Sequence, residues 1–277
     1  MDTISCLMVT EGRFPLARRA MDCYFAQGYP DKELVIVTCG SKEYKDNLTE
    51  YASACGRADV LVIHVPSRVP LGEMRNIAIE SASGPFVCQW DDDDLSHPQR
   101  LALQVNFLIK TQCEASVIGE NLHLFTDTGL IYWCNWAGSS RHIGHPATLL
   151  ARKAALPRYN KCLNRREDSA MQHQLIASGA GVSVIRGHAE LFLYTWHGTN
   201  VFQRMHHISL IRAYGLTLEA LGDKASRICA ALDIYSPMSE ITVADKNDTP
   251  LLVWKSSFDR PKPIVKIEPD GHHDNHR

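Results

Sequence analysis

Four consecutive carboxylates, at residues 91–94, have the clearest capacity for chemistry in this sequence. They directly follow an apolar run at residues 85–90. Like charges about 6 Å apart in a partly screened site repel each other by roughly 2–3 kcal/mol, so a fold keeps such a cluster for solvation or because a cation offsets the repulsion. We favour the cation, because the apolar run is typical of a core strand that would deliver the acids to a sheet edge.

The spacing of these acids indicates which cation. In an extended segment alternate side chains share a face, so Asp91 and Asp93 would point one way and Asp92 and Asp94 the other. Two carboxylates on one face suit Mg²⁺ or Mn²⁺, whose remaining ligands would be phosphate and water. Acids at a helix N-terminus are also favoured by the helix dipole, which accounts for Asp94 and Asp93 but not for four in a row after a strand.

The elements that position these acids alternate along the first ninety residues. Strands are expected at residues 4–9, 34–37, 60–63 and 86–90, and helices at 14–26, 42–55 and 71–82. This alternation predicts a parallel α/β sheet with right-handed crossovers. Ligands bind beyond the carboxyl ends of the strands in such sheets, which places Thr10, Gly40 and the four aspartates near one rim.

The pattern changes after residue 96. The sequence Ser96-His97-Pro98-Gln99 is typical of a capping box that starts a helix, and a hairpin is expected over residues 122–133. Further strands are expected at 115–118, 147–151, 182–185 and 191–194, and helices at 167–178, 202–221 and 223–232. A soft boundary near residue 112 therefore divides one compact unit.

Composition narrows the class of protein. The chain has 277 residues, of which 45% are hydrophobic and 22% charged, as in ordinary globular proteins. A net charge of −2 gives no electrostatic argument for nucleic acid. No apolar run approaches the roughly 20 residues of a membrane span, and no signal peptide is evident. The nine scattered cysteines indicate neither a disulfide framework nor a zinc cage, so a reduced, cytoplasmic setting is expected.

Four motifs in order resemble the family 2 inverting glycosyltransferases of the GT-A fold. They are a strand ending at Thr10, the strand end Val37-Thr38-Cys39-Gly40-Ser41, the helical pair Arg75-Asn76, and the aspartates at 91–94. The resemblance covers roughly residues 3–200. It implies an α/β fold: a GT-A Rossmann-like mixed sheet with flanking helices, an antiparallel acceptor half and C-terminal helices.

The resemblance, the change of pattern and the composition together predict a division of the chain. Residues 1–201 would form the glycosyltransferase domain, with a nucleotide-sugar-binding half at 1–111 and an acceptor half at 112–201. Residues 202–260 would be a C-terminal helical extension that could serve as an oligomer contact, a membrane-surface face or a lid. Residues 261–277, rich in Pro, Lys, Asp and His, would be a flexible tail.

On the donor side, the resemblance implies a nucleotide-diphosphate sugar whose diphosphate is held by Mn²⁺ or Mg²⁺ on Asp93, with Asp91 beside it. The predicted donor-binding residues are Thr10, Glu11, Thr38, Gly40, Arg75, Asp91 and Asp92. A structural ion pair remains open for Arg75, and a solvated loop position for Glu11. Where the family usually has an acidic pair, this chain has Thr38-Cys39, so the nucleotide base stays open and UDP is a default.

On the acceptor side, inverting transfer needs a base that takes the proton of the attacking hydroxyl. Glu167-Asp168 resembles the Glu-Asp that often starts a helix in the second half of the family. We predict Asp168 as the base, with Glu167 supporting the acceptor or the loop; a simple N-cap remains open for Asp168. The segment around His197 resembles the family's His-Gly-x-Asn, so His197 is predicted as a third metal ligand, although a structural role is equally open.

The predicted function is a metal-dependent inverting glycosyltransferase with a glycan, lipid-linked or protein acceptor. Peripheral association with the inner face of the membrane and oligomerisation both stay open. One alternative is a catalytically silent nucleotide- or carbohydrate-binding module. The other is a sugar-phosphate nucleotidyltransferase, which would want a Gly-rich loop where residues 10–13 offer a poor one.

Overall fold

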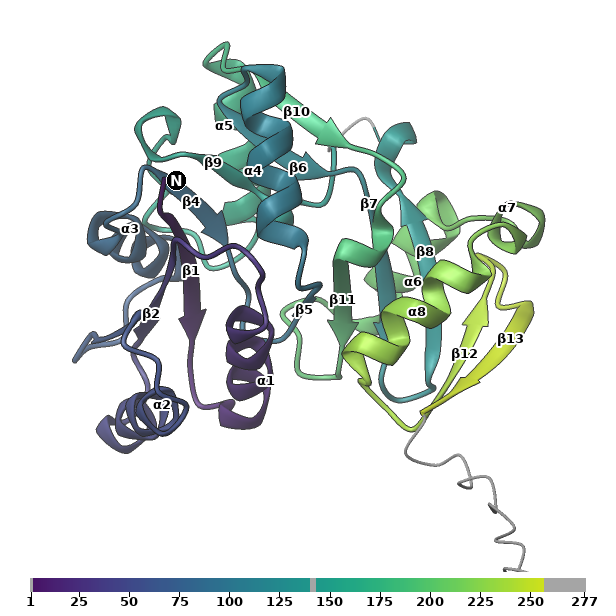
Figure 1. Cartoon of the computed structure of the whole chain (residues 1–277), viewed down its shortest axis with the longest axis horizontal. Coiled ribbons are helices and arrows are strands. Elements are labelled where there is room, and N and C mark those ends of the chain that lie inside the picture. The colour runs from purple at the N-terminus through teal and green to yellow at the C-terminus, as the bar shows by residue number, and fades with distance from the viewer. Residues whose placement is uncertain (1, 140–142, 257–277) are drawn as a thin grey trace, which may run out of the picture.

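The computed structural model describes residues 2–139 and 143–256, which form two mixed β-sheets with helices packed on their faces (Figure 1). The predicted tail at 261–277 lies outside the described residues. Within the described ranges, no helix combines the length and the apolar character that crossing a membrane requires.

The larger sheet has seven strands in the order β10-β6-β9-β4-β1-β2-β3. They are β1 (Ile4–Thr10), β2 (Lys32–Thr38), β3 (Val60–His64), β4 (Phe86–Gln89), β6 (Ala115–Ile118), β9 (Leu150–Arg152) and β10 (Val182–Ile185). β1 pairs in parallel with β2 and β4, and β2 pairs in parallel with β3, which confirms the predicted parallel arrangement. β9 lies antiparallel between β4 and β6, so the whole sheet is mixed.

Five helices cover this sheet. They are α1 (Phe14–Phe25), α2 (Lys42–Ala54), α3 (Leu71–Ser81), α4 (Arg100–Thr111) and α5 (Glu167–Ala177). Alternate residues of β1 point to opposite faces: Cys6 and Met8 lie in the core with α1, α2 and α4, whereas Leu7 lies in the core with α3 and α5. Because both faces are covered, the polar residues that follow the strands gather at the edge of the sheet.

The smaller sheet has six strands in the order β13-β12-β8-β7-β11-β5. They are β5 (Leu95–Ser96), β7 (Glu120–Phe125), β8 (Leu130–Asn135), β11 (Phe192–Trp196), β12 (Glu240–Ala244) and β13 (Pro250–Lys255). The predicted hairpin is confirmed as the antiparallel pair β7–β8. Two other pairings, β11–β7 and β12–β8, are parallel, so this half is not purely antiparallel.

The C-terminal segment combines helices and strands. Its helices are α6 (Arg204–Tyr214), α7 (Leu218–Gly222) and α8 (Ala225–Tyr235), and the strands β12 and β13 that follow were not predicted. Ile228 and Leu232 of α8 share one core with Trp133 of β8 and Trp254 of β13. The segment is therefore part of the smaller sheet's core. Single 3₁₀ turns complete the fold at Trp136–Gly138 (η1), Pro146–Thr148 (η2), Lys153–Ala155 (η3) and Ala189–Leu191 (η4).

Several predicted boundaries differ from the structure. The helix predicted at 202–221 is divided into α6 and α7, and η2 replaces the start of the strand predicted at 147–151. The capping box at residues 96–99 is wrong: Ser96 belongs to β5, which pairs with β11, and α4 begins only at Arg100 without a side-chain cap. The Ser96 hydroxyl instead accepts a hydrogen bond from Arg100. The proposed boundary near residue 112 does not separate the sheets, because β6, β9 and β10 all join the larger one. The chain passes from the larger sheet to the smaller one between β4 and β5, at residues 91–94.

Candidate functional site

One cavity of about 180 Å³ brings the two groups of acids together. All four aspartates of residues 91–94 line it, together with Glu167 and Asp168 at the start of α5. Arg13, before α1, and Arg75, on α3, also line it. The rest of its wall is formed mainly by residues before α5 and around β11, notably His145, Asn164, Arg165, Arg166, Tyr194, Asn200, Val201 and Phe202. Carboxylates distant in the sequence therefore face the same space.

Asp92 is held by a buried network at the end of β1. The Thr10 hydroxyl donates to Asp92 Oδ2 at 2.6 Å and lies 2.6 Å from the Tyr44 hydroxyl. Arg13 donates from Nη2 to Asp92 Oδ1 at 2.6 Å. Thr10, predicted to bind the donor, is itself buried and does not line the cavity. Its contact is with Asp92, so it positions the acid cluster.

The Asp93 carboxylate contacts two residues that are distant in the sequence, Arg13 and His197. Its Oδ2 accepts a hydrogen bond from Arg13 Nη1 at 3.0 Å and lies 3.1 Å from His197 Nε2. The other ring nitrogen of His197 lies 2.9 Å from the Thr199 hydroxyl, and the His197 amide donates to Asn200. His197 therefore does meet the acid cluster, but both of its ring nitrogens already have neighbours.

The four aspartates do not alternate between two faces as predicted, because residues 91–94 bend instead of continuing the strand. Asp92 and Asp93 consequently share Arg13, and all four side chains line the cavity. Asp94 does not hold the following helix: its Oδ1 accepts from the Thr195 amide of β11 at 2.9 Å. Its Oδ2 is buried without a hydrogen-bond partner among the described residues.

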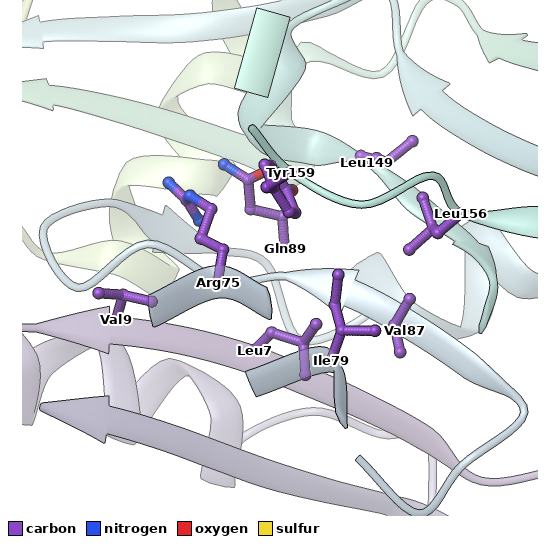
Figure 2. A pocket seen from close by; sticks show the side chains of 9 residues that line it. All are labelled: Leu7, Val9, Arg75, Ile79, Val87, Gln89, Leu149, Leu156 and Tyr159. Atoms are coloured by element: carbon purple, nitrogen blue, oxygen red, sulfur yellow. The ribbon is translucent and has the colours of Figure 1, made fainter. Parts of the chain in front are cut away.

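Arg75 connects the aspartates at 91–94 to the start of α5. Its Nη2 donates to Asp91 Oδ1 at 3.1 Å and its Nε to Glu167 Oε1 at 2.8 Å. Figure 2 shows the Arg75 side chain beside Gln89 and Tyr159, with Leu7 and Ile79 among the apolar residues next to it. The ion pair predicted as an alternative for Arg75 is present, and Arg75 also lines the cavity. The neighbouring Asn76 holds Tyr159 through two hydrogen bonds, so it is structural.

Replacing Arg75 with methionine is expected to lower the free energy of unfolding by about 3–5 kcal/mol, because Asp91 and Glu167 lose their common partner inside the protein. Urea denaturation measures the change. The matched control is Arg158→Met, since the Arg158–Glu80 ion pair is exposed and should contribute less than about 1 kcal/mol. Equal losses in the two variants would show that the Arg75 network contributes no more to the free energy of unfolding than an exposed ion pair does.

Asp168 has the features of a proton acceptor. Burial raises the pKa of its carboxyl group to about 6; neighbouring Glu167 adds to the rise and Arg75 opposes it. Its Oδ1 accepts from the Ser169 amide at 2.6 Å, whereas Oδ2 accepts no hydrogen bond from the described residues. The predicted N-cap role is wrong, because Asp168 lies within the first turn of α5 and the N-cap position is Arg166. Asp168 thus presents a free carboxylate oxygen in the cavity wall.

The pKa values within the acid cluster diverge. Burial raises the pKa of Asp92 to about 7, and the charge on Asp93 adds to that rise. Burial would also raise the pKa of Asp93, but hydrogen bonding to His197 and the charge of Arg13 outweigh it and hold that pKa below its ordinary value. The pKa of buried Asp94 lies well above the usual range. Asp93 is therefore the carboxylate most firmly kept ionised.

A divalent cation fits this site only if protein carboxylates and substrate phosphate share its coordination. Across residues 2–139 and 143–256, no three His, Cys, Asp or Glu side chains are arranged to hold a metal by themselves. Asp93 Oδ1 accepts no hydrogen bond within the described chain, and Asp94 Oδ2 is an orphaned buried acceptor. Mg²⁺ typically binds one or two carboxylates and completes its shell with water and substrate phosphate. The donor set here is of that kind.

The remaining predicted donor residues lie outside the cavity wall. Thr38 is fully buried and its hydroxyl accepts from the Gly40 amide, closing the turn after β2. Glu11 is exposed and pairs with Arg68 at 3.6 Å. These residues lie at the carboxyl ends of β1 and β2, outside the cavity wall. The cavity brings together Arg75, Asp91, Asp92, Asp93, Glu167 and Asp168 but not Thr10, Glu11, Thr38, Gly40 or His197.

Sequence reasoning missed Arg13, which holds both Asp92 and Asp93. A basic residue directly after the β1 loop was the available signal, because the carboxyl end of β1 was already expected near the acids. Tyr194 and Phe202 were also missed as wall residues. Both residues lie close in the sequence to His197, which was predicted as a metal ligand.

Comparisons of sequence with known proteins agree on one family. The model described as Glycosyl transferase family 2 matches residues 5–160. The chain is also 33% identical over 100 residues to "Putative colanic acid biosynthesis glycosyl transferase WcaA" of Escherichia coli (strain K12). That match spans 36% of this chain and 36% of the relative, so the chain aligns with about a third of the relative's length.

Solved structures share the fold at low sequence identity. S. aureus TarS 1-349 in complex with UDP is 15% identical with a TM-score of 0.54, over 84% of this chain and 80% of that one. The mannosyltransferase PcManGT from Pyrobaculum calidifontis, in complex with GDP-Man and Mn²⁺, is 15% identical with a TM-score of 0.57. That match covers 76% of this chain and 61% of the other. The predicted GT-A fold is confirmed by these similarities.

Proposed function

Because the chain belongs to glycosyl transferase family 2, we propose that it is a metal-dependent, inverting glycosyltransferase that uses a nucleotide-diphosphate sugar. The observation that carries the proposal is the single cavity in which the acids at 91–94 face Asp168. A donor held by the first group would present its sugar to an acceptor held near the second. The structural neighbours named for UDP and for GDP-Man with Mn²⁺ support a nucleotide-sugar donor.

The proposed roles follow the contacts. Asp93 would hold Mn²⁺ or Mg²⁺ with the donor diphosphate, and Asp91 would join it if its hydrogen bonds from Arg75 and Gln89 rearrange. A bound cation would offset charge on the leaving group as a Lewis acid. Arg13 and Thr10 would keep Asp92 and Asp93 in place. A direct metal bond from His197 would require its contacts with Asp93 and Arg13 to rearrange.

Asp168 would complete the reaction as the general base. It would take the proton of the acceptor hydroxyl while that oxygen bonds to the anomeric carbon and the bond from this carbon to the diphosphate breaks. One displacement inverts the configuration. Glu167, held by Arg75, would act as a support for the loop and not as the proton acceptor.

Calorimetric titration with UDP, GDP, ADP and CDP, each with and without Mn²⁺, tests the donor assignment. We expect one nucleotide to bind at least about tenfold more tightly with Mn²⁺, and its sugar conjugates to be turned over. Because residues 38 and 39 lack the family's acidic pair, UDP and GDP enter the panel on equal terms. Metal-dependent binding without hydrolysis or transfer from any sugar conjugate would instead indicate a catalytically silent module.

The pH dependence of kcat/KM provides a further prediction. A general base works only when deprotonated, and the pKa of Asp168 is raised to about 6. We therefore expect kcat/KM to rise tenfold per pH unit below about 6 and to level off above 7. Initial rates between pH 5 and pH 8, with Mn²⁺ held saturating, give the profile. A rate that stays flat from pH 5 upward would contradict the assignment of Asp168.

A further inference from the structure

The edge of the cavity beside Asp168, called the rim below, carries both basic and aliphatic side chains. Arg165 and Arg166 lie on it, exposed, and neither forms an ion pair within the described residues. Val201, also in the cavity wall, is 52% exposed, and Met205 on the first turn of α6 is 66% exposed. Arg165, Arg166 and Val201 therefore line the same cavity as the proposed base, and Met205 follows Val201 by four residues in the chain.

Phe202 joins the two parts of this rim. The Arg166 guanidinium lies over its ring, 5.9 Å from the centroid, and the His206 ring stacks on it with centroids 4.5 Å apart. Arg166 also adopts a left-handed backbone conformation, with φ of 58°. Residues other than glycine rarely adopt this conformation, and strain of this kind clusters at ligand-binding positions. The arrangement holds Arg166 at the mouth at an energetic cost.

We propose that this rim binds a lipid-linked acceptor through its phosphate, with Arg165 and Arg166 on the phosphate oxygens and Val201 and Met205 against the lipid chain. The proposal rests on the proposed function and names the acceptor class for the same site. Paired guanidinium groups match phosphate geometry, and here no carboxylate within the described chain competes for them. Exposed Val and Met side chains gain from burial against hydrocarbon, whereas a sugar chain would offer them hydroxyl groups.

Charge explains why such a phosphate would stop at the rim. The cavity behind it carries six carboxyl groups, and the two arginines that pair with them, Arg13 and Arg75, are already engaged. An anionic headgroup would be repelled from that interior unless it met cations first. Arg165 and Arg166 directly precede Glu167-Asp168, so a phosphate held there would leave the acceptor hydroxyl within reach of the base.

Flotation with phosphatidylcholine vesicles containing 5 mol% long-chain polyprenyl phosphate tests the proposal. Chelator is included so that the donor site takes no metal-bound phosphate. We expect wild-type protein to bind these vesicles at least about tenfold more tightly than vesicles matched in charge with phosphatidylglycerol. The double variant Arg165→Gln/Arg166→Gly should bind about 25-fold more weakly, at about fivefold per lost cation near a membrane surface. Glycine adopts the left-handed conformation of residue 166 without strain, which protects the fold.

Matched variants separate the rim from general effects. Met205→Ser should weaken vesicle binding about threefold. Arg186→Gln and Ile234→Ser, which remove an exposed charge and an exposed side chain elsewhere, should stay within about twofold of wild type. Equal binding to phosphatidylglycerol, no effect of the double variant, or equal losses in these controls would each overturn the proposal.

Nucleotide binding on the same preparations distinguishes this inference from the proposed function. If the double variant loses Mn²⁺-dependent nucleotide affinity as far as it loses vesicle binding, the arginines serve the donor and the proposal is wrong. A wild-type protein that binds the lipid phosphate but no nucleotide would keep the lipid site and lose the transferase assignment. Nucleotide binding without lipid binding would do the reverse.

Discussion

Replacing Asp168 with asparagine is expected to lower kcat by about 10²–10⁴-fold, the usual contribution of a positioned general base. Asparagine keeps the size of the side chain and its hydrogen bond from Ser169, but it cannot take a proton. Because Asp168 does not contact the aspartates at 91–94 directly, Mn²⁺-dependent nucleotide affinity should change by less than about threefold. Steady-state kinetics and calorimetric titration on the same sample measure both quantities.

The control for this variant is Asp127→Asn, whose carboxylate is exposed and pairs with Arg204 away from the cavity wall. It should leave kcat unchanged. Loss of less than about tenfold in the Asp168 variant would assign the proton acceptor elsewhere. Loss of nucleotide affinity together with kcat would mean that Asp168 supports the donor, and the separation into donor and base sides would have to be abandoned.

Asp93→Ala is expected to remove metal-dependent nucleotide binding. Residues that merely orient metal ligands cost 10–100-fold in affinity when replaced, so a direct carboxylate ligand should cost about 100-fold or more. The Asp93 carboxylate is the one held ionised by His197 and Arg13, which makes it the strongest anionic ligand in the cluster. Calorimetric titration of the nucleotide preferred by wild-type protein, with and without Mn²⁺, gives the measurement.

Asp46→Ala is the matched control, because it removes an exposed carboxylate on α2 that pairs with Lys45. Its Mn²⁺ dependence should equal that of the wild type. The metal-dependent mechanism would be refuted by an Asp93→Ala protein that retains full activity in chelator-treated buffer. Retained nucleotide binding that no longer responds to Mn²⁺ would support Asp93 as the ligand.

The sequence pattern predicted those strands whose order and direction follow from neighbouring segments of the chain. The apolar runs of β1 to β4 are bounded by turn residues and separated by helices, so their order and direction could be predicted. β5 could not, because it depends on a partner far away in the chain, β11. The pairing of β12 with β13 is local and was missed, whereas the parallel pairing of β12 with β8 joins distant parts of the chain. Ser96-His97-Pro98-Gln99 satisfied a helix-start pattern locally, but the pairing of Ser96 with Phe192 decided its conformation.

The candidate site likewise has features that could be predicted from the sequence and features that could not. Asp91, Asp93 and Asp168 could be predicted from residue type and from resemblance, and the structure brings them to one cavity. The directions of the side chains could not, because the bend at residues 91–94 replaced the expected alternation. The two ion pairs of Arg13 could not be predicted, because they depend on that bend.

The passage of the chain from one sheet to the other at residues 91–94 has a consequence for how such enzymes can diversify. Asp93 follows a strand of the larger sheet, and Asp168 lies on α5, which packs against that same sheet. Tyr194 belongs to the smaller sheet, and Val201 follows its strand β11. Under the proposed roles, the metal-binding acid and the base would both be positioned by the larger sheet, whereas Tyr194 and Val201 of the cavity wall depend on the smaller one. Substitutions in the smaller sheet could then change which acceptor is admitted without altering the distance between Asp93 and Asp168.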